Sequence, residues 1–129
     1  HTRLVLYKRI ANAVNQQQLR ELQVEMIDRF GLLPSPVKNL FRVTGIKLQA
    51  ERLGIKKVDV GEKGGKIEFL QETRVSASEI VALVQSNPHQ FRLTSANQLS
   101  FKDNIEDREK RFTQIEKLLD RLSKQQISD

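Results

Sequence analysis

Cysteine and tryptophan are absent from the 129-residue chain, and its aromatic side chains are limited to six phenylalanines and one tyrosine. Without cysteine, the chain has no disulfide framework, no thiolate metal site and no cysteine nucleophile, which suits a reducing compartment. No apolar run approaches the roughly 18 residues of a membrane-spanning helix. We therefore expect a cytoplasmic protein with no membrane segment.

The residues that are present indicate a folded, globular chain. Hydrophobic residues make up 38% and charged residues 29% of the sequence, a balance too apolar for a disordered segment. A length of 129 residues predicts one domain, residues 1–129, with a core that needs no crosslink. The chain begins with His1 and Thr2 rather than methionine, so we expect it to be excised from a larger multidomain protein, with these two residues from a tag or a domain boundary.

Basic residues exceed acidic ones by 22 to 16, which gives a net charge of +6. The excess lies mainly in residues 1–54, which carry nine basic and four acidic side chains. One hypothesis is therefore a basic module that binds nucleic acid through phosphate contacts from this segment. Its candidate contacts are Arg3, Lys8, Arg9, Lys38, Arg42, Lys47 and Arg52. The scarcity of aromatic side chains for base stacking makes this the second choice.

Helical periodicity dominates the first 54 residues, where apolar spacings of three and four predict helices over residues 4–14, 16–30 and 36–53. Asn15, with Gln18 three residues later, predicts a capped start for the second helix, and Gly31 and Gly54 predict left-handed helix ends. The predicted buried faces are Tyr7, Ile10, Ala11 and Val14 on the first helix and Leu19, Leu22, Met26, Ile27 and Phe30 on the second.

Two-residue alternation replaces this pattern in the middle of the chain. Residues 55–60 and 66–70 alternate on either side of a glycine-rich connection, residues 61–65, and predict a hairpin. Residues 91–93 and 99–101 predict a second hairpin in the same way.

Two further helices complete the expected fold. Ser76 and Glu79 form an S-x-x-E capping box before a short helix that ends ahead of Pro88. A long helix over residues 105–126 carries a heptad-like apolar seam, which we expect to pack on the domain, with a coiled-coil dimer as the alternative. The predicted fold class is thus α+β, with about five helices packed with a small antiparallel sheet of two hairpins, and we expect a monomer.

The residue patterns that carry catalysis are missing. Residues 60–67 (VGEKGGKI) resemble a phosphate-binding loop, but Val60 stands where that loop needs glycine and Ile67 where it needs a hydroxyl. His89 is the only histidine away from the terminus and is expected in a surface loop, with no second imidazole to share a metal. We expect no catalytic, cofactor-binding or metal-binding residue in this chain.

One surface of the second predicted helix is unusual. Glu21, Glu25 and Asp28 fall within roughly 60° of one another, opposite the apolar face, with Arg29 beside them. Like charges at these spacings repel, and on this reading only the Glu25–Arg29 spacing offsets the repulsion. Because such a stripe in a basic chain would be relieved by a partner's arginines, we take these four residues as a candidate partner-binding surface, against the alternative of a solvated face.

Longer strings of the sequence match a known family. Residues 7–11 (YKRIA), 25–34 (EMIDRFGLLP), 53–55 (LGI), 62–65 (EKGG) and 67–69 (IEF), in this order, resemble the C-terminal domain of the bacterial transcription-repair coupling factors. The resemblance covers nearly the whole chain, which makes it far more specific than a short motif.

The resemblance implies a non-catalytic regulatory domain of an ATP-dependent DNA translocase that displaces stalled RNA polymerase and couples it to nucleotide excision repair. In that family ATP, magnesium and DNA belong to the motor domains, and an N-terminal UvrB-like module recruits UvrA. The domain is implied to be an autoinhibitory clamp that docks on the UvrB-like module and covers its UvrA-binding surface. The docking surface that it implies contains Glu25, Asp28 and Arg29.

Overall fold

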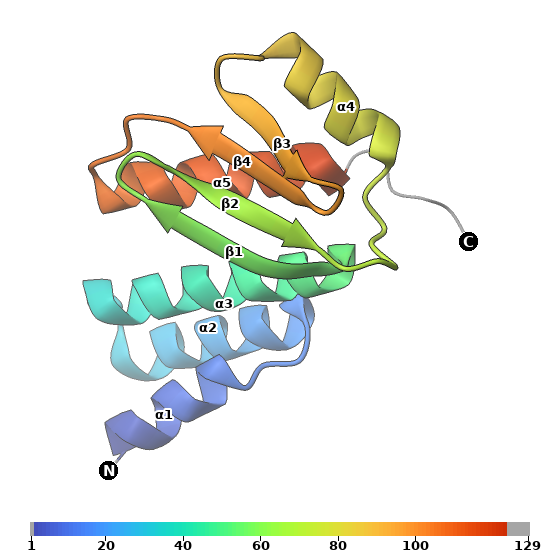
Figure 1. Cartoon of the computed structure of the whole chain (residues 1–129). Coiled ribbons are helices and arrows are strands. Elements are labelled where there is room, and N and C mark those ends of the chain that lie inside the picture. The colour runs from blue at the N-terminus through green and yellow to red at the C-terminus, as the bar shows by residue number, and fades with distance from the viewer. Residues whose placement is uncertain (1, 124–129) are drawn as a thin grey trace. The chain divides into compact units, whose positions relative to one another are not determined.

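The computed structural model describes residues 2–123 and contains, over these residues, five helices and four strands (Figure 1). In chain order the elements are α1 (Thr2–Ala11), α2 (Gln16–Phe30), α3 (Ser35–Leu53), β1 (Ile55–Gly61), β2 (Gly64–Phe69), α4 (Ala77–Ser86), β3 (Phe91–Ser95), β4 (Gln98–Lys102) and α5 (Arg108–Ser123). The four strands form one antiparallel sheet, which confirms the predicted α+β class with two hairpins.

The chain divides into two compact units, His1–Leu48 and Gln49–Asp129. Helix α3 runs without a break through the boundary between them. The single-domain expectation for residues 1–129 stays a prediction.

The first unit is a three-helix assembly around its own apolar core. The core side chains come from all three helices and their connections: Leu6, Ile10, Ala13, Leu19, Leu22, Met26, Leu33, Val37, Phe41 and Leu48. Asn15 caps α2 as predicted, because its side-chain oxygen accepts a hydrogen bond of 2.8 Å from the Gln18 backbone N–H. Gly31 ends α2 at a φ of 77°, a conformation that strains any residue with a Cβ.

Two of the predicted buried faces are wrong in part. Helix α1 ends at Ala11, so Val14 lies beyond it and is exposed, and Ala13 takes the buried position instead. On α2, Leu19, Leu22 and Met26 are buried as expected, but Ile27 and Phe30 are 47% and 51% exposed. The helix therefore buries a narrower stripe than its sequence suggests and leaves large apolar side chains on its surface.

The second unit is built around the sheet, whose strand order is β1-β2-β4-β3. Ile67 on β2 and Leu99 on β4 are neighbours in the register and are fully buried, whereas the alternate positions on these strands are more exposed. The apolar face packs with α5, whose buried side chains are Ile115, Leu118, Leu119 and Leu122. Figure 1 shows α5 running behind the sheet, and α4 beyond its β3 edge.

Three sequence predictions differ from the second unit in detail. The first hairpin turns at only Glu62 and Lys63, because Gly61, Gly64 and Gly65 are strand residues. A Cβ at Gly65 would clash first with the Asp59 carbonyl oxygen on β1 and then, at 2.9 Å, with the Phe101 ring, so the glycine allows the close approach of both. Ser76 is the N-cap of α4 but makes no capping hydrogen bond from its side chain, since its hydroxyl pairs with that of Ser78.

The bounds and the burial of helix α5 can be compared with the predicted long helix and with the coiled-coil dimer given as its alternative. The predicted start at residue 105 is three residues early, and the predicted end at residue 126 lies outside the described residues. Leu119 and Leu122 are fully buried within this single chain. The seam is thus already covered, which favours packing on the chain itself over pairing with a second helix.

Candidate functional site

The predicted partner-binding residues lie on the outward side of α2, in the first unit. Glu21, Asp28 and Arg29 are exposed, and Glu25 is partly buried. The structure therefore places the four predicted residues on one helix, with Glu21 and Asp28 turned away from Leu22 and Met26, whereas Arg29 lies two turns beyond Leu22 on the same side.

Glu25 already has a cationic partner inside the unit. The Arg9 guanidinium reaches from α1 and donates two hydrogen bonds to the Glu25 carboxylate, with Nη1–Oε2 and Nη2–Oε1 distances of 2.8 and 3.2 Å. The Arg29 Nη1 atom lies 3.7 Å from the same Oε2. The expectation that only Arg29 offsets the acidic stripe is therefore wrong, because the stronger partner comes from another helix.

These contacts change how both groups ionise. The hydrogen bonds from Arg9 hold the pKa of the Glu25 carboxyl below its ordinary value of 4.5; burial opposes them, and the charges of Arg9 and then Arg29 add smaller lowering effects. The same hydrogen bonds and the Glu25 charge raise the pKa of Arg9. At neutral pH this is a fixed, fully ionised pair at the edge of the α2 surface.

The other two carboxylates are less constrained. Glu21 accepts one hydrogen bond of 3.2 Å from the Gln17 side chain. No hydrogen bond or ion pair from the described part of the chain reaches the Asp28 carboxylate. The Arg29 guanidinium carbon lies 5.4 Å from the centre of the Phe30 ring, in cation–π geometry. Asp28 is thus the carboxylate most open to a cation from outside.

Exposed apolar side chains accompany these charges, and the sequence analysis missed them. Val24 is 68% exposed, and it lies between Glu21 and Asp28 on the helix surface, with Ile27 on its other side. We call the exposed surface of α2 that carries Glu21, Val24, Glu25, Ile27, Asp28 and Arg29 the α2 face; it extends over more than half of the helix circumference, with Ile27 and Arg29 at its two borders. The signal was present at Val24, a β-branched apolar residue on the polar side of the helix, whereas Ile27 was assigned to the core because it borders the buried stripe.

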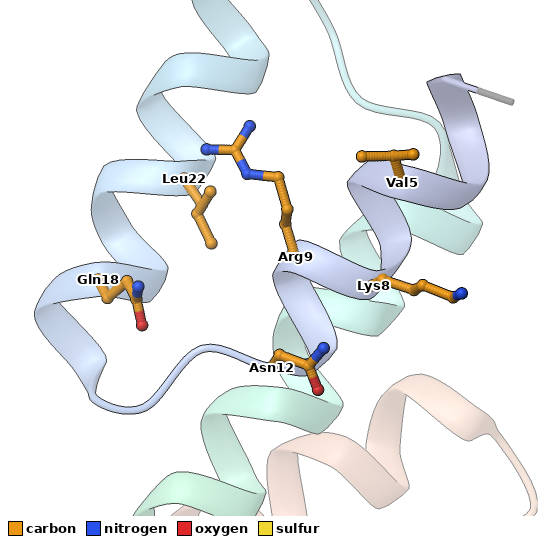
Figure 2. A pocket seen from close by; sticks show the side chains of 6 residues that line it. All are labelled: Val5, Lys8, Arg9, Asn12, Gln18 and Leu22. Carbon is orange, nitrogen blue, oxygen red and sulfur yellow. The ribbon is translucent and has the colours of Figure 1, made fainter.

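An open groove between α1 and α2 adjoins the α2 face (Figure 2). Its lining is Val5, Lys8, Arg9, Asn12, Gln18 and Leu22. Figure 2 shows the Arg9 side chain crossing from α1 towards α2, whereas Lys8 extends away from α2. Arg9 therefore belongs both to the groove and to the ion pair with Glu25.

The residues of the nucleic-acid hypothesis line up only in part: on α3, Lys38, Arg42 and Arg52 fall within roughly 80° of one another. On α3, Lys38 and Lys47 are nine residues apart and point about 180° away from each other around the helix. Arg9 is engaged by Glu25, and Arg42 also has an interaction partner within the chain. The nucleic-acid hypothesis stays a prediction, with Arg9 and Arg42 already engaged within the chain.

The structure also bears on the histidine, the metal sites and the membrane segments considered from the sequence. His89 is exposed, in the connection between α4 and β3. Within the described residues no group of three or more His, Asp or Glu side chains is arranged to hold a metal ion. No helix of residues 2–123 is long and apolar enough to cross a membrane.

Comparisons with known proteins identify the family of this chain. The sequence profile of the TRCF domain matches residues 1–80. The transcription-repair-coupling factor of Escherichia coli K12 is 38% identical over 128 residues, which cover 99% of this chain and 11% of that protein. That of Buchnera aphidicola from Acyrthosiphon pisum is 32% identical over 127 residues, which cover 98% of this chain and 16% of the relative.

A solved structure shares the fold. The crystal structure of a C-terminal domain of transcription-repair coupling factor matches with a TM-score of 0.67 and 21% identity, over 93% of this chain and 80% of that one. The fold is thus that of a C-terminal domain from a multidomain factor. The chain belongs to the TRCF domain family of the transcription-repair coupling factors, and it spans only 11% and 16% of the two relatives named above.

Proposed function

We propose that this chain is a regulatory docking module that binds, through the α2 face, to a UvrB-like module of the same protein and covers its UvrA-binding surface. The observation that carries the proposal is the composition of the α2 face, where the unpartnered Asp28 carboxylate lies beside the exposed Val24 and Ile27. A surface of this kind is complementary to a partner patch that carries arginines next to apolar side chains.

The mixture of charged and apolar groups suits a contact that must open. A regulatory interface within one protein is expected to be smaller and more polar than an obligate one. Asp28 and Glu25 would give the docked state its orientation, because pairing with arginine is directional and bidentate. Val24 and Ile27 would supply the area that water leaves on docking.

The wider protein is inferred from the family alone. We infer that it is an ATP-dependent DNA translocase of the bacterial cytoplasm, whose motor domains bind ATP, magnesium and DNA and act on stalled RNA polymerase. In that setting the present chain is non-catalytic, and UvrA is its competitor for the UvrB-like module. An ATPase assay on this chain alone is expected to show no turnover.

Calorimetric titration of the chain with the isolated UvrB-like module tests the docking surface. We expect Glu25→Ala combined with Asp28→Ala to weaken binding by at least about tenfold, because two charge-assisted contacts are removed. Glu72→Ala is the control, since Glu72 is an exposed carboxylate in the other unit. Unchanged affinity in the double variant, or an equal loss in the control, would count against the α2 face.

A further inference from the structure

A second concave site lies in the other unit, on the open face of the sheet. Its polar lining comes from strands β3 and β4 and from the turn that precedes β3: His89, Gln90, Arg92, Thr94, Ser100 and Lys102. Arg92 and Ser100 are partners in the β3–β4 register, and Lys102 lies two residues beyond Ser100 on the same side of β4. Because successive side chains alternate between faces, Arg92, Ser100 and Lys102 all project away from the buried Phe91 and Phe101.

The charges of this pocket have one sign. Arg92 and Lys102 are exposed and occupy diagonal positions of the antiparallel pair, so their Cβ atoms are within roughly 7–8 Å. None of the lining residues is a carboxylate. Within the described residues, no hydrogen bond or ion pair is made by the Arg92 guanidinium or the Lys102 ammonium.

The opposite edge of the same sheet is different. Lys57 lies on β1 with its Nζ atom 3.4 Å from the Asp59 carboxylate, and the Lys56 Nζ atom is 4.0 Å from Glu68. Lys56 and Lys57 at that edge are therefore balanced by acids, whereas Arg92 and Lys102 have no acid partner among residues 2–123. Two like charges at diagonal positions repel, and an anion between them removes that repulsion.

The pocket also supplies neutral polar groups. The Ser100 hydroxyl donates to the Thr94 hydroxyl over 3.4 Å, and Thr94 donates to the Gln98 side chain over 2.8 Å. These hydroxyls are thus held in place by one another, and the side-chain donors still free for a ligand are the guanidinium, the ammonium, the Gln90 amide and the His89 imidazole. A planar guanidinium beside a lysine is the donor set that suits a tetrahedral oxyanion.

We propose that this pocket binds a phosphate group, with Arg92 donating to two of its oxygens and Lys102 to a third. The group can be supplied as free phosphate or as a phosphodiester of a single-stranded nucleic acid, and the two sources share this chemistry. The site is separate from the α2 face and from the basic residues of the first unit, so it does not depend on the docking proposal.

A structural role is the competing explanation. Helix α4 ends at Ser86 with no basic residue in its last turn, so cations near that end could act on the helix dipole instead. In that case removing Arg92 and Lys102 would lower the melting temperature but leave no ligand effect. The test therefore measures both quantities.

The experiment is an NMR titration of backbone amides with inorganic phosphate at constant ionic strength. We expect saturable shifts at Gln90, Arg92 and Lys102, and roughly a tenfold or greater loss of affinity in the double variant Arg92→Gln with Lys102→Gln. Lys57→Gln is the control, since it removes one positive charge from the same sheet at a site already paired with an acid. The melting temperature of the double variant should remain close to that of the unmodified chain.

A second arm identifies the source by titrating a short oligothymidine. Saturation of the same amides at lower concentration, with a steep salt dependence, assigns the site to a nucleic-acid backbone, and saturation by phosphate alone assigns it to the free anion. Shifts that never saturate with either probe overturn the proposal. An equal loss of phosphate affinity in Lys57→Gln also overturns the proposal. Tighter binding of a poly-glutamate peptide than of phosphate at these amides overturns it too, because it would indicate an acidic protein partner.

Discussion

Arg9 is the residue that most changes the interpretation of the acidic stripe. The sequence places Glu21, Glu25 and Asp28 on one helix surface. It does not show that Arg9, 16 positions before Glu25, forms an ion pair with Glu25. In the undocked chain this arginine occupies the position that a partner's arginine would take. Docking through Glu25 then requires the partner to share or displace an internal contact, whereas docking through Asp28 does not.

Replacing Arg9 by glutamine should release Glu25. We expect the pKa of the Glu25 carboxyl to rise, because the lowering effects of Arg9 are removed and burial outweighs the charge of Arg29, and NMR titration of the side-chain carboxyl measures this. Binding of the UvrB-like module should become a few-fold tighter, because no internal cation competes. Weaker binding would mean that Arg9 shapes the surface rather than competing for it.

The same pair predicts a pH dependence of stability. Because the folded-state pKa of Glu25 lies below 4.5, the contribution of the pair is complete above pH 4.5 and is lost as the pH falls through the lowered pKa. The melting temperature of Arg9→Gln should therefore be lower than that of the unmodified chain at neutral pH, and the difference should shrink and vanish as the pH falls below 4.5 and through the lowered pKa. A difference that is constant with pH would exclude the ion pair as its cause.

At the scale of elements, helix α2 carries two adjacent apolar residues with different expected roles, one in the stability of the fold and one in docking. Met26 is buried in the core of the first unit, and Ile27 is 47% exposed on the α2 face. Met26→Ala should destabilise the chain by about 2–5 kcal/mol, whereas Ile27→Ala should change stability by well under about 1 kcal/mol and weaken docking. Chemical denaturation and calorimetry measure the two effects, and a stability loss of similar size in both variants would contradict this assignment.

The residue that follows α3 must be glycine for two reasons, its backbone conformation and its close neighbours. Gly54 has a φ of +76°, and an added Cβ would lie 2.7 Å from the Thr73 Cα. That segment cannot easily retreat, because the Thr73 hydroxyl and the Arg74 N–H both donate to the Leu53 carbonyl.

Gly54→Ala should therefore be more destabilising than Gly31→Ala, which has a similar φ and no neighbour within 4 Å. Backbone strain alone costs about 1–3 kcal/mol at each position, and the close contact adds to it only at Gly54. The midpoints of denaturant unfolding compare the two, and equal losses would show that the Thr73 segment moves aside.

Local signals in the sequence predicted the ends of elements better than their faces. Asn15, Gly31 and Gly54 mark helix ends through their own backbone chemistry, and all three function as predicted. The capping box predicted at Ser76 does not form, because the Ser76 hydroxyl pairs with the hydroxyl of Ser78 instead. Ile27 and Phe30 were assigned to the core because the width of a buried stripe depends on what packs against it, which no local pattern records.

On the scale of the whole molecule, the two units divide the proposed roles. The α2 face and its arginine partner lie in His1–Leu48, and the phosphate pocket lies in Gln49–Asp129. The relatives named above are six to nine times longer than the segment they share with this chain, so the chain corresponds to a small part of each of them.

Hydrogen exchange of this chain, with and without the UvrB-like amino-terminal module, tests the central claim most directly. The docking proposal predicts slower exchange concentrated in α2, between Gln16 and Phe30, with the strands of the second unit unchanged. Protection that falls on the sheet or on α5 while α2 exchanges as before would contradict the assignment of the α2 face.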